Sequence, residues 1–486
     1  MKKTTVLQQV RTGSLWALAV LVAAIATSSA AQEGNRIVKQ FDGGGIYEGT
    51  FRDGKQHGTG TYTLPNGYTY TGEWVDGEIR GQGEARFPNG SVYIGAFVAG
   101  KPEGQGRITF ADGATYQGQW ADGKMSGQGL ASYADGSLYD GNFANSRHDG
   151  RGVLETSDGY TYDGMWVDGA KTGDARITYA DGSIYEGGVL EGVREGEGTL
   201  IMPDGLEYSG QWAAGQFTGS GRLVQPNGDI YEGALVDGRR QGSGVMTYAN
   251  GWTYTGSFDG DLRHGLGTFE GPDGYRYEGS WIEGRIEGDG TVTYPDSSAY
   301  TGSFVNGTPE GFGKITYPDG STYEGGWVAG VIAGAGTARY ANGIVYEGSF
   351  QNAQTHGQGT ITYPGGYSYS GNWDRGEKEG KGKATYADGS VYEGDFVAGL
   401  REGQGSLVRS DGFRYEGAWG AGEMNGMGRA VYTNGDVYEG MFENGRRSGE
   451  GTLTYIGGQV ESGQWQNGVL ITPPDTAAPQ TDAPQQ

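Results

Sequence analysis

A tyrosine recurs every 23 residues along this sequence, from Tyr47 to Tyr438, without an insertion or deletion. If each of these eighteen tyrosines is counted as position 0, glycine stands at +2 and +11 in every unit. Glycine also stands at +13 except for Ala175, and at +20 except for Ser297. Such a strict period predicts an array of repeats, in which each unit packs against its neighbours in the chain.

Within one repeat, tyrosine, glycine and an aromatic residue alternate in a way that is typical of a β-strand. Position +4 is aromatic in every repeat except those with Val189 and Leu235. Positions 0, +2 and +4 share one face of a strand, because side chains alternate between the faces with a period of two. We expect an aromatic ring to lie flat over the bare glycine backbone.

Two turn signals divide each repeat into two strands. Position +19 is Asp or Asn in all but two repeats and precedes the glycine at +20, and Asp-Gly and Asn-Gly favour a type I′ hairpin turn. Glycines near +7 and +11 bracket the second turn. Glycine, at 99 of 486 residues, is about three times its usual frequency, which disfavours helices. The sequence therefore predicts consecutive antiparallel β-hairpins.

The N-terminal segment, residues 1–31, differs from the rest of the chain and is typical of a secretory signal peptide. Basic residues precede the 12-residue apolar stretch 15–26, and small residues offer cleavage near Ala30 or Ala31. The apolar stretch is shorter than the roughly 20 residues that a membrane-spanning helix needs. We therefore expect a periplasmic or secreted protein.

The remaining boundaries follow from the repeat. We expect a lead strand in 32–45, eighteen full repeats and a partial C-terminal repeat in 46–469, and a disordered Pro/Ala/Gln-rich tail in 470–486. Position +4 mostly alternates between Phe and Trp, so that pairs of repeats form a 46-residue unit. This alternation slips once, between the repeats of Tyr254 and Tyr277.

The repeat resembles the MORN repeat family in the motif YEGxFxxGxxxGxG, for instance from Tyr392 to Gly405, and in the following DGxxYxG. The resemblance covers residues 46 to about 468. It implies an all-β fold, an elongated, twisted single antiparallel sheet of consecutive hairpins, and a scaffolding or protein-binding role. A basic residue after the +7 glycine is present in only some repeats, which weakens the implied binding of anionic membranes.

The residue types that carry catalysis do not gather in this sequence. There is no cysteine, and the four histidines, in the turn before the +11 glycine, lie several repeats apart. Acidic residues recur at +1, but no pair among them is distinguished from the others. We therefore expect no catalytic site, no metal site and no cofactor. The formal charge of −24 disfavours nucleic acid as a partner.

The aromatic face is the candidate partner-binding surface. Its tryptophans are either the core of a thin sheet or a groove for a partner. The candidate residues are Trp74, Trp120, Trp166, Trp212, Trp281, Trp327, Trp373 and Trp419. The sequence thus predicts a non-catalytic secreted scaffold of the bacterial envelope that binds a protein or peptide. The alternative is a binder of envelope glycans that uses the same aromatic face.

Overall fold

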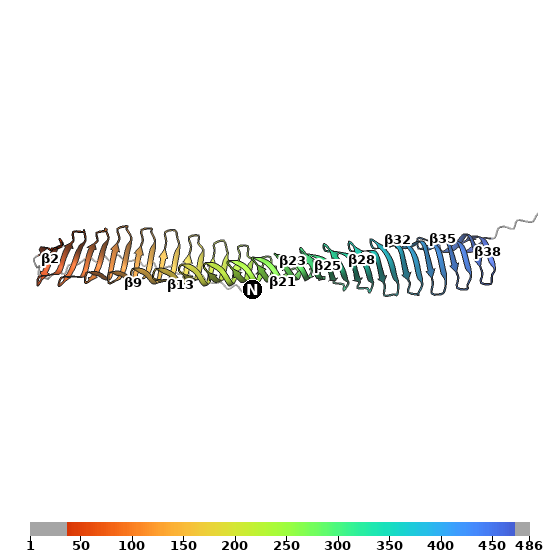
Figure 1. Cartoon of the computed structure of the whole chain (residues 1–486), viewed down its shortest axis with the longest axis horizontal. Coiled ribbons are helices and arrows are strands. Elements are labelled where there is room, and N and C mark those ends of the chain that lie inside the picture. Colours follow the sequence, from red (N-terminus) through yellow and green to blue (C-terminus); the bar gives the residue numbers. More distant parts are fainter. Residues whose placement is uncertain (1–35, 472–486) are drawn as a thin grey trace, which may run out of the picture. The chain divides into compact units, whose positions relative to one another are not determined.

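The computed structural model describes residues 36–471, and these residues form strands and turns without a helix. The predicted signal peptide lies outside the described residues, as does the predicted tail beyond Ile471. The chain divides into two compact units, residues 36–157 with 166–169, and residues 158–165 with 170–471. Figure 1 shows strand following strand in chain order within each unit.

The first unit contains eleven strands, each antiparallel to its neighbour in sequence. They are β1 (Ile37–Gln40), β2 (Ile46–Arg52), β3 (Lys55–Thr63), β4 (Thr69–Val75), β5 (Glu78–Arg86), β6 (Val92–Val98), β7 (Lys101–Thr109), β8 (Thr115–Ala121), β9 (Lys124–Ser132), β10 (Leu138–Ala144) and β11 (Arg147–Glu155). The lead strand β1 pairs with β2 ahead of the first full repeat. Strand β12 (Thr161–Val167) lies where the two units divide.

The second unit continues the same pattern from β13 to β39. Its strands are β13 (Ala170–Thr178), β14 (Ile184–Leu190), β15 (Val193–Ile201), β16 (Glu207–Ala213), β17 (Gln216–Val224), β18 (Ile230–Val236), β19 (Arg239–Thr247), β20 (Thr253–Asp259), β21 (Leu262–Glu270), β22 (Arg276–Ile282), β23 (Arg285–Thr293), β24 (Ala299–Val305), β25 (Thr308–Thr316), β26 (Thr322–Val328), β27 (Val331–Arg339), β28 (Val345–Gln351), β29 (Gln354–Thr362), β30 (Ser368–Asp374), β31 (Glu377–Thr385), β32 (Val391–Val397), β33 (Leu400–Val408), β34 (Arg414–Gly420), β35 (Glu423–Val431), β36 (Val437–Glu443), β37 (Arg446–Thr454), β38 (Val460–Gln466) and β39 (Val469–Leu470). The prediction of an all-β array with two antiparallel strands per repeat is confirmed.

The two turns of each repeat differ in type, and here the sequence-based prediction is wrong. The type I′ turn lies at +6/+7, where both central residues have positive φ, as in Asp53 (48°) and Gly54 (78°). At +19/+20 only the glycine has positive φ, for instance Gly67 at 92°. The side-chain oxygen of Asn66 accepts a hydrogen bond from the backbone N–H of Tyr68 (3.0 Å) and so stabilises a type I turn before that glycine.

The glycine at +11 lies within a strand instead of bracketing a turn. Gly58 belongs to β3 and has a φ of 83°. The pairing of β2 with β3 shifts register beside it, since Gly49 pairs with Gly60 while Phe51 pairs with Gln56. This is a β-bulge, which a left-handed glycine accommodates without strain. The bulge recurs in the later repeats for which the register is described, for example between β30 and β31.

Candidate interaction surfaces

One face of the sheet is formed by the position-0 tyrosines, and we call it the tyrosine face. Tyr369 shows the arrangement: it is fully buried, and its ring covers the paired glycines Gly371 and Gly382. A Cβ atom at Gly382 would lie 2.4 Å from the ring of Tyr369. The expected covering of glycine by a ring is therefore present, and a side chain at Gly382 would force the ring or the backbone to move.

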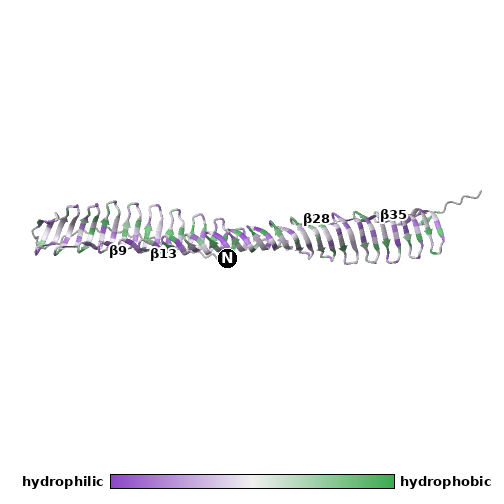
Figure 2. Cartoon of the chain, in the orientation of Figure 1, coloured by the Kyte–Doolittle hydropathy of each residue, from purple (hydrophilic) through white to green (hydrophobic). Residues whose placement is uncertain are grey.

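The rings of successive repeats contact one another edge to face. Trp373 lies 5.3 Å from both Tyr346 and Tyr369, measured between ring centroids, and Tyr369 lies 5.0 Å from Phe396. This is the favoured geometry of aromatic pairs. The indole N–H of Trp373 donates to the carbonyl oxygen of Gly359 (3.1 Å), so the polar atom of the buried tryptophan is satisfied. Figure 2 shows short hydrophobic bands recurring from strand to strand.

The structure places all eight candidate tryptophans in this core. Their exposed fractions range from 2 % for Trp212 to 7 % for Trp120, Trp327 and Trp373. The exposed fractions of the other four tryptophans lie within this range; they are Trp74, Trp166, Trp281 and Trp419. Of the two interpretations of the aromatic face, these eight side chains fit the core. One of them, Trp281, also lines a small cavity.

Side chains at position +9 cover these tryptophans, which the sequence analysis did not anticipate. The guanidinium carbon of Arg401 lies 4.2 Å from the ring centroid of Trp419, and that of Arg447 lies 4.2 Å from Trp465. Arg447 also donates to the carbonyl oxygen of Gly468 (2.7 Å) in the neighbouring turn. Each contact joins residues 18 positions apart, a spacing that identifies the pair only when the register of the repeats is known.

Acidic residues at position +10 stabilise the next type I′ turn. Glu103 accepts the backbone N–H of Asp122 (2.8 Å), and Glu310 accepts that of Ala329 (2.7 Å). His57, at the same position, accepts the N–H of Asp76 through Nδ1 (3.4 Å). The four histidines lie in strands β3, β11, β21 and β29 and not in turns, which corrects the prediction.

The opposite face carries the acidic residues of position +1, as predicted. Several of them pair across strands with position +14, for example Glu439 with Arg429 (2.9 Å) and Glu232 with Arg222 (3.3 Å). Hydroxyl pairs occupy these positions elsewhere, such as Thr291 with Thr301 (3.0 Å). Among residues 36–471, no group of three or more His, Cys, Asp or Glu side chains is arranged to hold a metal ion.

A groove runs across the strands of the second unit on this opposite face, and we call it the glycine groove. Three hollows of about 740, 630 and 680 Å³ lie along it, each floored by paired glycines of positions +2 and +13. They span residues 266–302, 312–348 and 358–417. The floor is bare backbone because these positions are glycine, and a Cβ atom there would meet a tyrosine ring on the tyrosine face.

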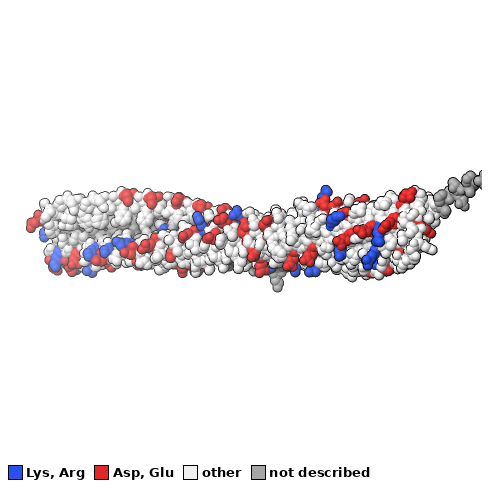
Figure 3. Space-filling view, turned by 45° about the vertical axis from the view of Figure 1, so that its right-hand side comes forward, with Lys and Arg blue, Asp and Glu red and all other residues white. Residues whose placement is uncertain are grey.

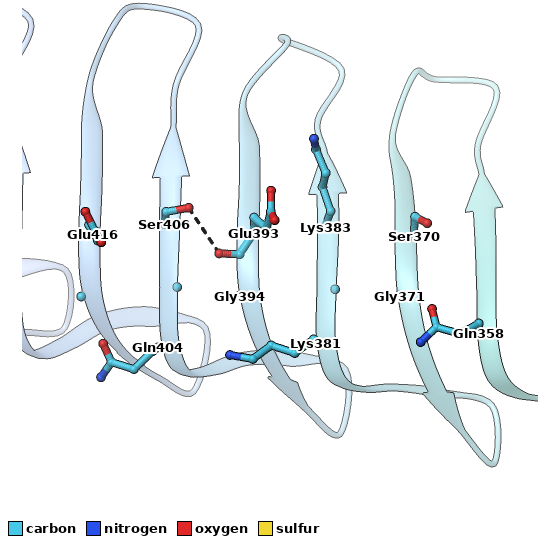
Figure 4. A pocket seen from close by; sticks show the side chains of 13 residues that line it. Gln358, Ser370, Gly371, Lys381, Lys383, Glu393, Gly394, Gln404, Ser406 and Glu416 are labelled. Atoms are coloured by element: carbon cyan, nitrogen blue, oxygen red, sulfur yellow. Dashed lines mark hydrogen bonds between the residues drawn. The ribbon is translucent and has the colours of Figure 1, made fainter.

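The side chains in the walls of the glycine groove differ from repeat to repeat. Figure 4 shows the side chains of Lys381 and Gln404 on one side of the glycines, and those of Glu393 and Ser406 on the other. Ser406 donates to the carbonyl oxygen of Glu393 (3.4 Å). In the earlier hollows the wall includes apolar side chains, notably Leu266 and Phe312, which are 73 % and 67 % exposed.

Charges of both signs lie over the surface of each unit. On the face drawn in Figure 3, acidic side chains recur and basic side chains lie among them. Lys381, for example, lies 2.7 Å from Asp395 at the wall of the glycine groove. None of the described residues forms a helix that is long and apolar enough to cross a membrane.

Comparison with known families finds the model described as MORN repeat along most of the chain. The eighteen matched segments are 47–67, 70–92, 93–115, 116–138, 139–159, 162–184, 185–207, 208–230, 231–253, 254–274, 277–299, 300–322, 323–345, 346–366, 369–391, 392–414, 415–437 and 438–460. A search of curated proteins found no match.

Three similar solved structures are distant likenesses. The TCP domain of SAS-4 (dCPAP) of Drosophila melanogaster, in complex with a proline-rich motif of Ana2 (dSTIL), is 16 % identical, with a TM-score of 0.22 over 32 % of this chain and 85 % of that one. The TCP10 domain of Danio rerio CPAP with a STIL peptide is 16 % identical, with a TM-score of 0.16 over 55 % and 93 %. A streptogramin B lyase is 12 % identical, with a TM-score of 0.11 over 61 % and 92 %. At these TM-scores, neither a binding mode nor an activity is transferred.

Proposed function

Because the chain belongs to the MORN repeat family, we propose that it is a non-catalytic scaffold that binds a protein or peptide partner along the glycine groove. The observation that carries this proposal is the recurrence of three hollows at the same repeat positions. An extended partner segment lying across the strands meets a new set of wall residues in each repeat. The partner is thus specified by the walls, while the floor stays constant.

The proposed location is the periplasm or the exterior of a bacterial cell. It rests on the signal-peptide pattern of residues 1–31, with Lys2, Lys3 and Arg11 ahead of the apolar stretch and cleavage near Ala30 or Ala31. The sequence contains no cysteine, so the chain forms no disulfide in that compartment. A partner in the cell envelope is the corresponding expectation.

The alternative function, glycan binding by the aromatic face, relied on exposed rings. The tryptophans that would stack on sugars are 2 to 7 % exposed, and several are covered by arginine side chains. The glycine groove offers amide and carboxylate groups but, in its largest hollow, no aromatic ring. These contacts favour a protein or peptide over a glycan.

Filling the groove tests the proposal. In the Ser370→Trp/Ser406→Trp variant, two bulky side chains occupy the hollow between residues 358 and 417. The matched control is Ser368→Trp, on the same strand as Ser370 but outside the hollow. Partner capture from periplasmic extract, followed by binding of the purified partner, is measured for the unaltered chain, the double variant and the control. Binding to purified peptidoglycan is measured in parallel.

We expect the double variant to lose partner binding by at least tenfold and the control to retain it. Circular dichroism establishes that both variants keep their strands. Unchanged binding by the double variant would refute the assignment of the groove. Binding of peptidoglycan in place of a protein would instead support the glycan alternative.

A further inference from the structure

The slip in the alternation of the repeats concentrates aromatic residues at one place in the second unit. Position −2 carries a large aromatic residue in the two consecutive repeats that begin there, Trp252 and Tyr275. Elsewhere this position is often serine, as in Ser298 and Ser321. Trp252 is also the one tryptophan within residues 36–471 that does not stand at position +4. Because the neighbouring repeats lack this pair, the surface at the slip differs from the surface of the other repeats.

The aromatic side chains at the slip contact one another and remain half-buried. Trp252 stacks on Phe269, with ring centroids 4.7 Å apart and planes at 23°, and Tyr275 lies 5.6 Å from Trp252. Gly271 occupies a position where most repeats carry an aromatic residue. A Cβ atom at Gly271 would lie 2.8 Å from the indole of Trp252, so Trp252 fills part of the space that this missing side chain leaves.

A cavity remains beside this cluster, and we call it the slip pocket. It has a volume of about 320 Å³, and its walls include Trp252, Phe269, Tyr275, Trp281 and Ile286. These residues stand at positions −2, +15, +4 and +9, which belong to the tyrosine face. The slip pocket and the glycine groove therefore lie on opposite faces of the sheet.

Two arginines border the slip pocket. The guanidinium carbon of Arg263 lies 4.1 Å from the ring centroid of Trp281 and 5.0 Å from that of Phe269. Arg285 also lines the pocket, and its side chain is 3.6 Å from the carboxylate of Glu283. The charged residues that line the pocket are thus Arg263 and Arg285, on a chain whose net charge is −24.

We propose that the slip pocket binds a peptide segment through one large apolar or aromatic side chain that is flanked by carboxylates. The aromatic walls would receive the anchor side chain, since buried aromatic anchors dominate many protein interfaces. Arg263 and Arg285 would attract the flanking acidic groups. A stacked glycan fits less well, because one face of Trp252 is already occupied by Phe269. This site does not depend on the function proposed for the glycine groove.

The probe is the peptide Gly-Gly-Glu-X-Glu-Gly-Gly, in which X is 4-fluorophenylalanine, and ¹⁹F NMR follows its binding to the full chain. The comparison peptide has lysine in place of both glutamates. The test variant is Trp252→Ser, which restores the serine common at position −2. Its matched control is Tyr367→Ser at the same position of another repeat.

We expect saturable binding of the acidic peptide, at least tenfold weaker binding of the lysine peptide, and loss of binding in Trp252→Ser but not in Tyr367→Ser. The double variant Trp252→Ser/Gly271→Tyr rebuilds an ordinary repeat and should also fail to bind. Full binding by Trp252→Ser, or equal binding of the two peptides, would overturn the proposal. So would binding of an N-acetylglucosamine oligosaccharide at this site without binding of the peptide.

The groove variant Ser370→Trp/Ser406→Trp separates the two proposals. It should bind the acidic peptide as the unaltered chain does, because its substitutions lie on the opposite face. Loss of peptide binding in this variant would show that the peptide occupies the glycine groove, which would overturn the assignment to the slip pocket.

Discussion

Tyr369 and Ser370 are neighbours in β30, yet they lie in different environments. Tyr369 is fully buried over a glycine pair and contacts the rings of Trp373 in its own repeat and Phe396 in the next, while Ser370 lines the wall of the glycine groove. The tyrosine face is nearly the same in every repeat because ring, glycine and ring must fit together. The opposite face has no such constraint, so its wall residues vary. The tyrosine face thus stabilises the fold, and the opposite face is proposed to recognise the partner. The slip pocket is the exception, because it is a proposed binding site on the tyrosine face.

Alkali should unfold the protein through the tyrosine face. Burial raises the pKa of Tyr208, Tyr254 and Tyr346 to about 12, whereas an unfolded tyrosine titrates near pH 10. Above about pH 10 the unfolded state loses protons first, so stability is full below that pH and falls as the pH rises towards 12. Ionisation of the position-0 tyrosines and loss of the strand circular dichroism signal should therefore occur together. Ionisation of these buried tyrosines with intact strands would contradict this.

Truncation of one core ring compares the faces within a single strand. Trp373→Ala should destabilise its region by about 3–5 kcal/mol, as for other buried tryptophans. The adjacent Asn372→Ala, on the opposite face, should cost less than about 1 kcal/mol. Hydrogen exchange of β29 to β31 in the full chain measures the local loss of stability in each variant, because repeat proteins open locally. Equal exchange in the two variants would mean that the faces contribute alike.

Adding a methyl group to the groove floor should disturb the tyrosine face. A Cβ atom at Gly382 would lie 2.4 Å from the Tyr369 ring, so Gly382→Ala should cost about 1–3 kcal/mol by overpacking. The buried Ala175 at the same repeat position indicates that the backbone can adjust. Lys383→Ala, the next residue, serves as the control and should change local hydrogen exchange little. A neutral Gly382→Ala would show that the ring does not require glycine.

Removal of a covering arginine should have the smallest effect. Arg401→Met keeps the aliphatic packing on Trp419 and removes the cation, so we expect a loss of about 0.5–2 kcal/mol. Arg414→Met, on the opposite face, should stay within about 0.5 kcal/mol. Tryptophan fluorescence and hydrogen exchange near β34 measure the difference. If Arg414→Met had the larger effect, the covering role of position +9 would be wrong.

Much of the fold follows from the repeat itself. The tyrosine period, the glycine at +2 and the turn glycines predicted two antiparallel strands per repeat, with the +1 residues opposite the tyrosines. The turn types could not be read from dipeptides, because Asp-Gly occurs in both turns, for instance at Asp76-Gly77 and Asp112-Gly113. What separates them is the number of residues between the strands and the Asx hydrogen bond of the longer turn.

The candidate site was harder to predict. The sequence left two interpretations of the tryptophans open, the core of a thin sheet or a groove for a partner. Their burial depends on side chains from the preceding repeat, such as Arg447 over Trp465, 18 residues away in sequence. The glycine groove likewise arises from cross-strand pairs such as Gly394 with Gly405. Predicting the burial of the tryptophans or the glycine groove requires the strand register. The sequence period gives that register only when the bulge at +11 is taken into account.

Photo-cross-linking in the producing cells tests the division between the two faces most directly. The amino acid p-benzoylphenylalanine replaces Gln404 in the wall of the glycine groove, or Tyr386, whose ring lies 5.5 Å from that of Tyr367 on the tyrosine face. We predict that a discrete protein cross-links from position 404 and that none cross-links from position 386. Cross-linking from position 386 without cross-linking from position 404 would contradict the assignment of recognition to the glycine groove.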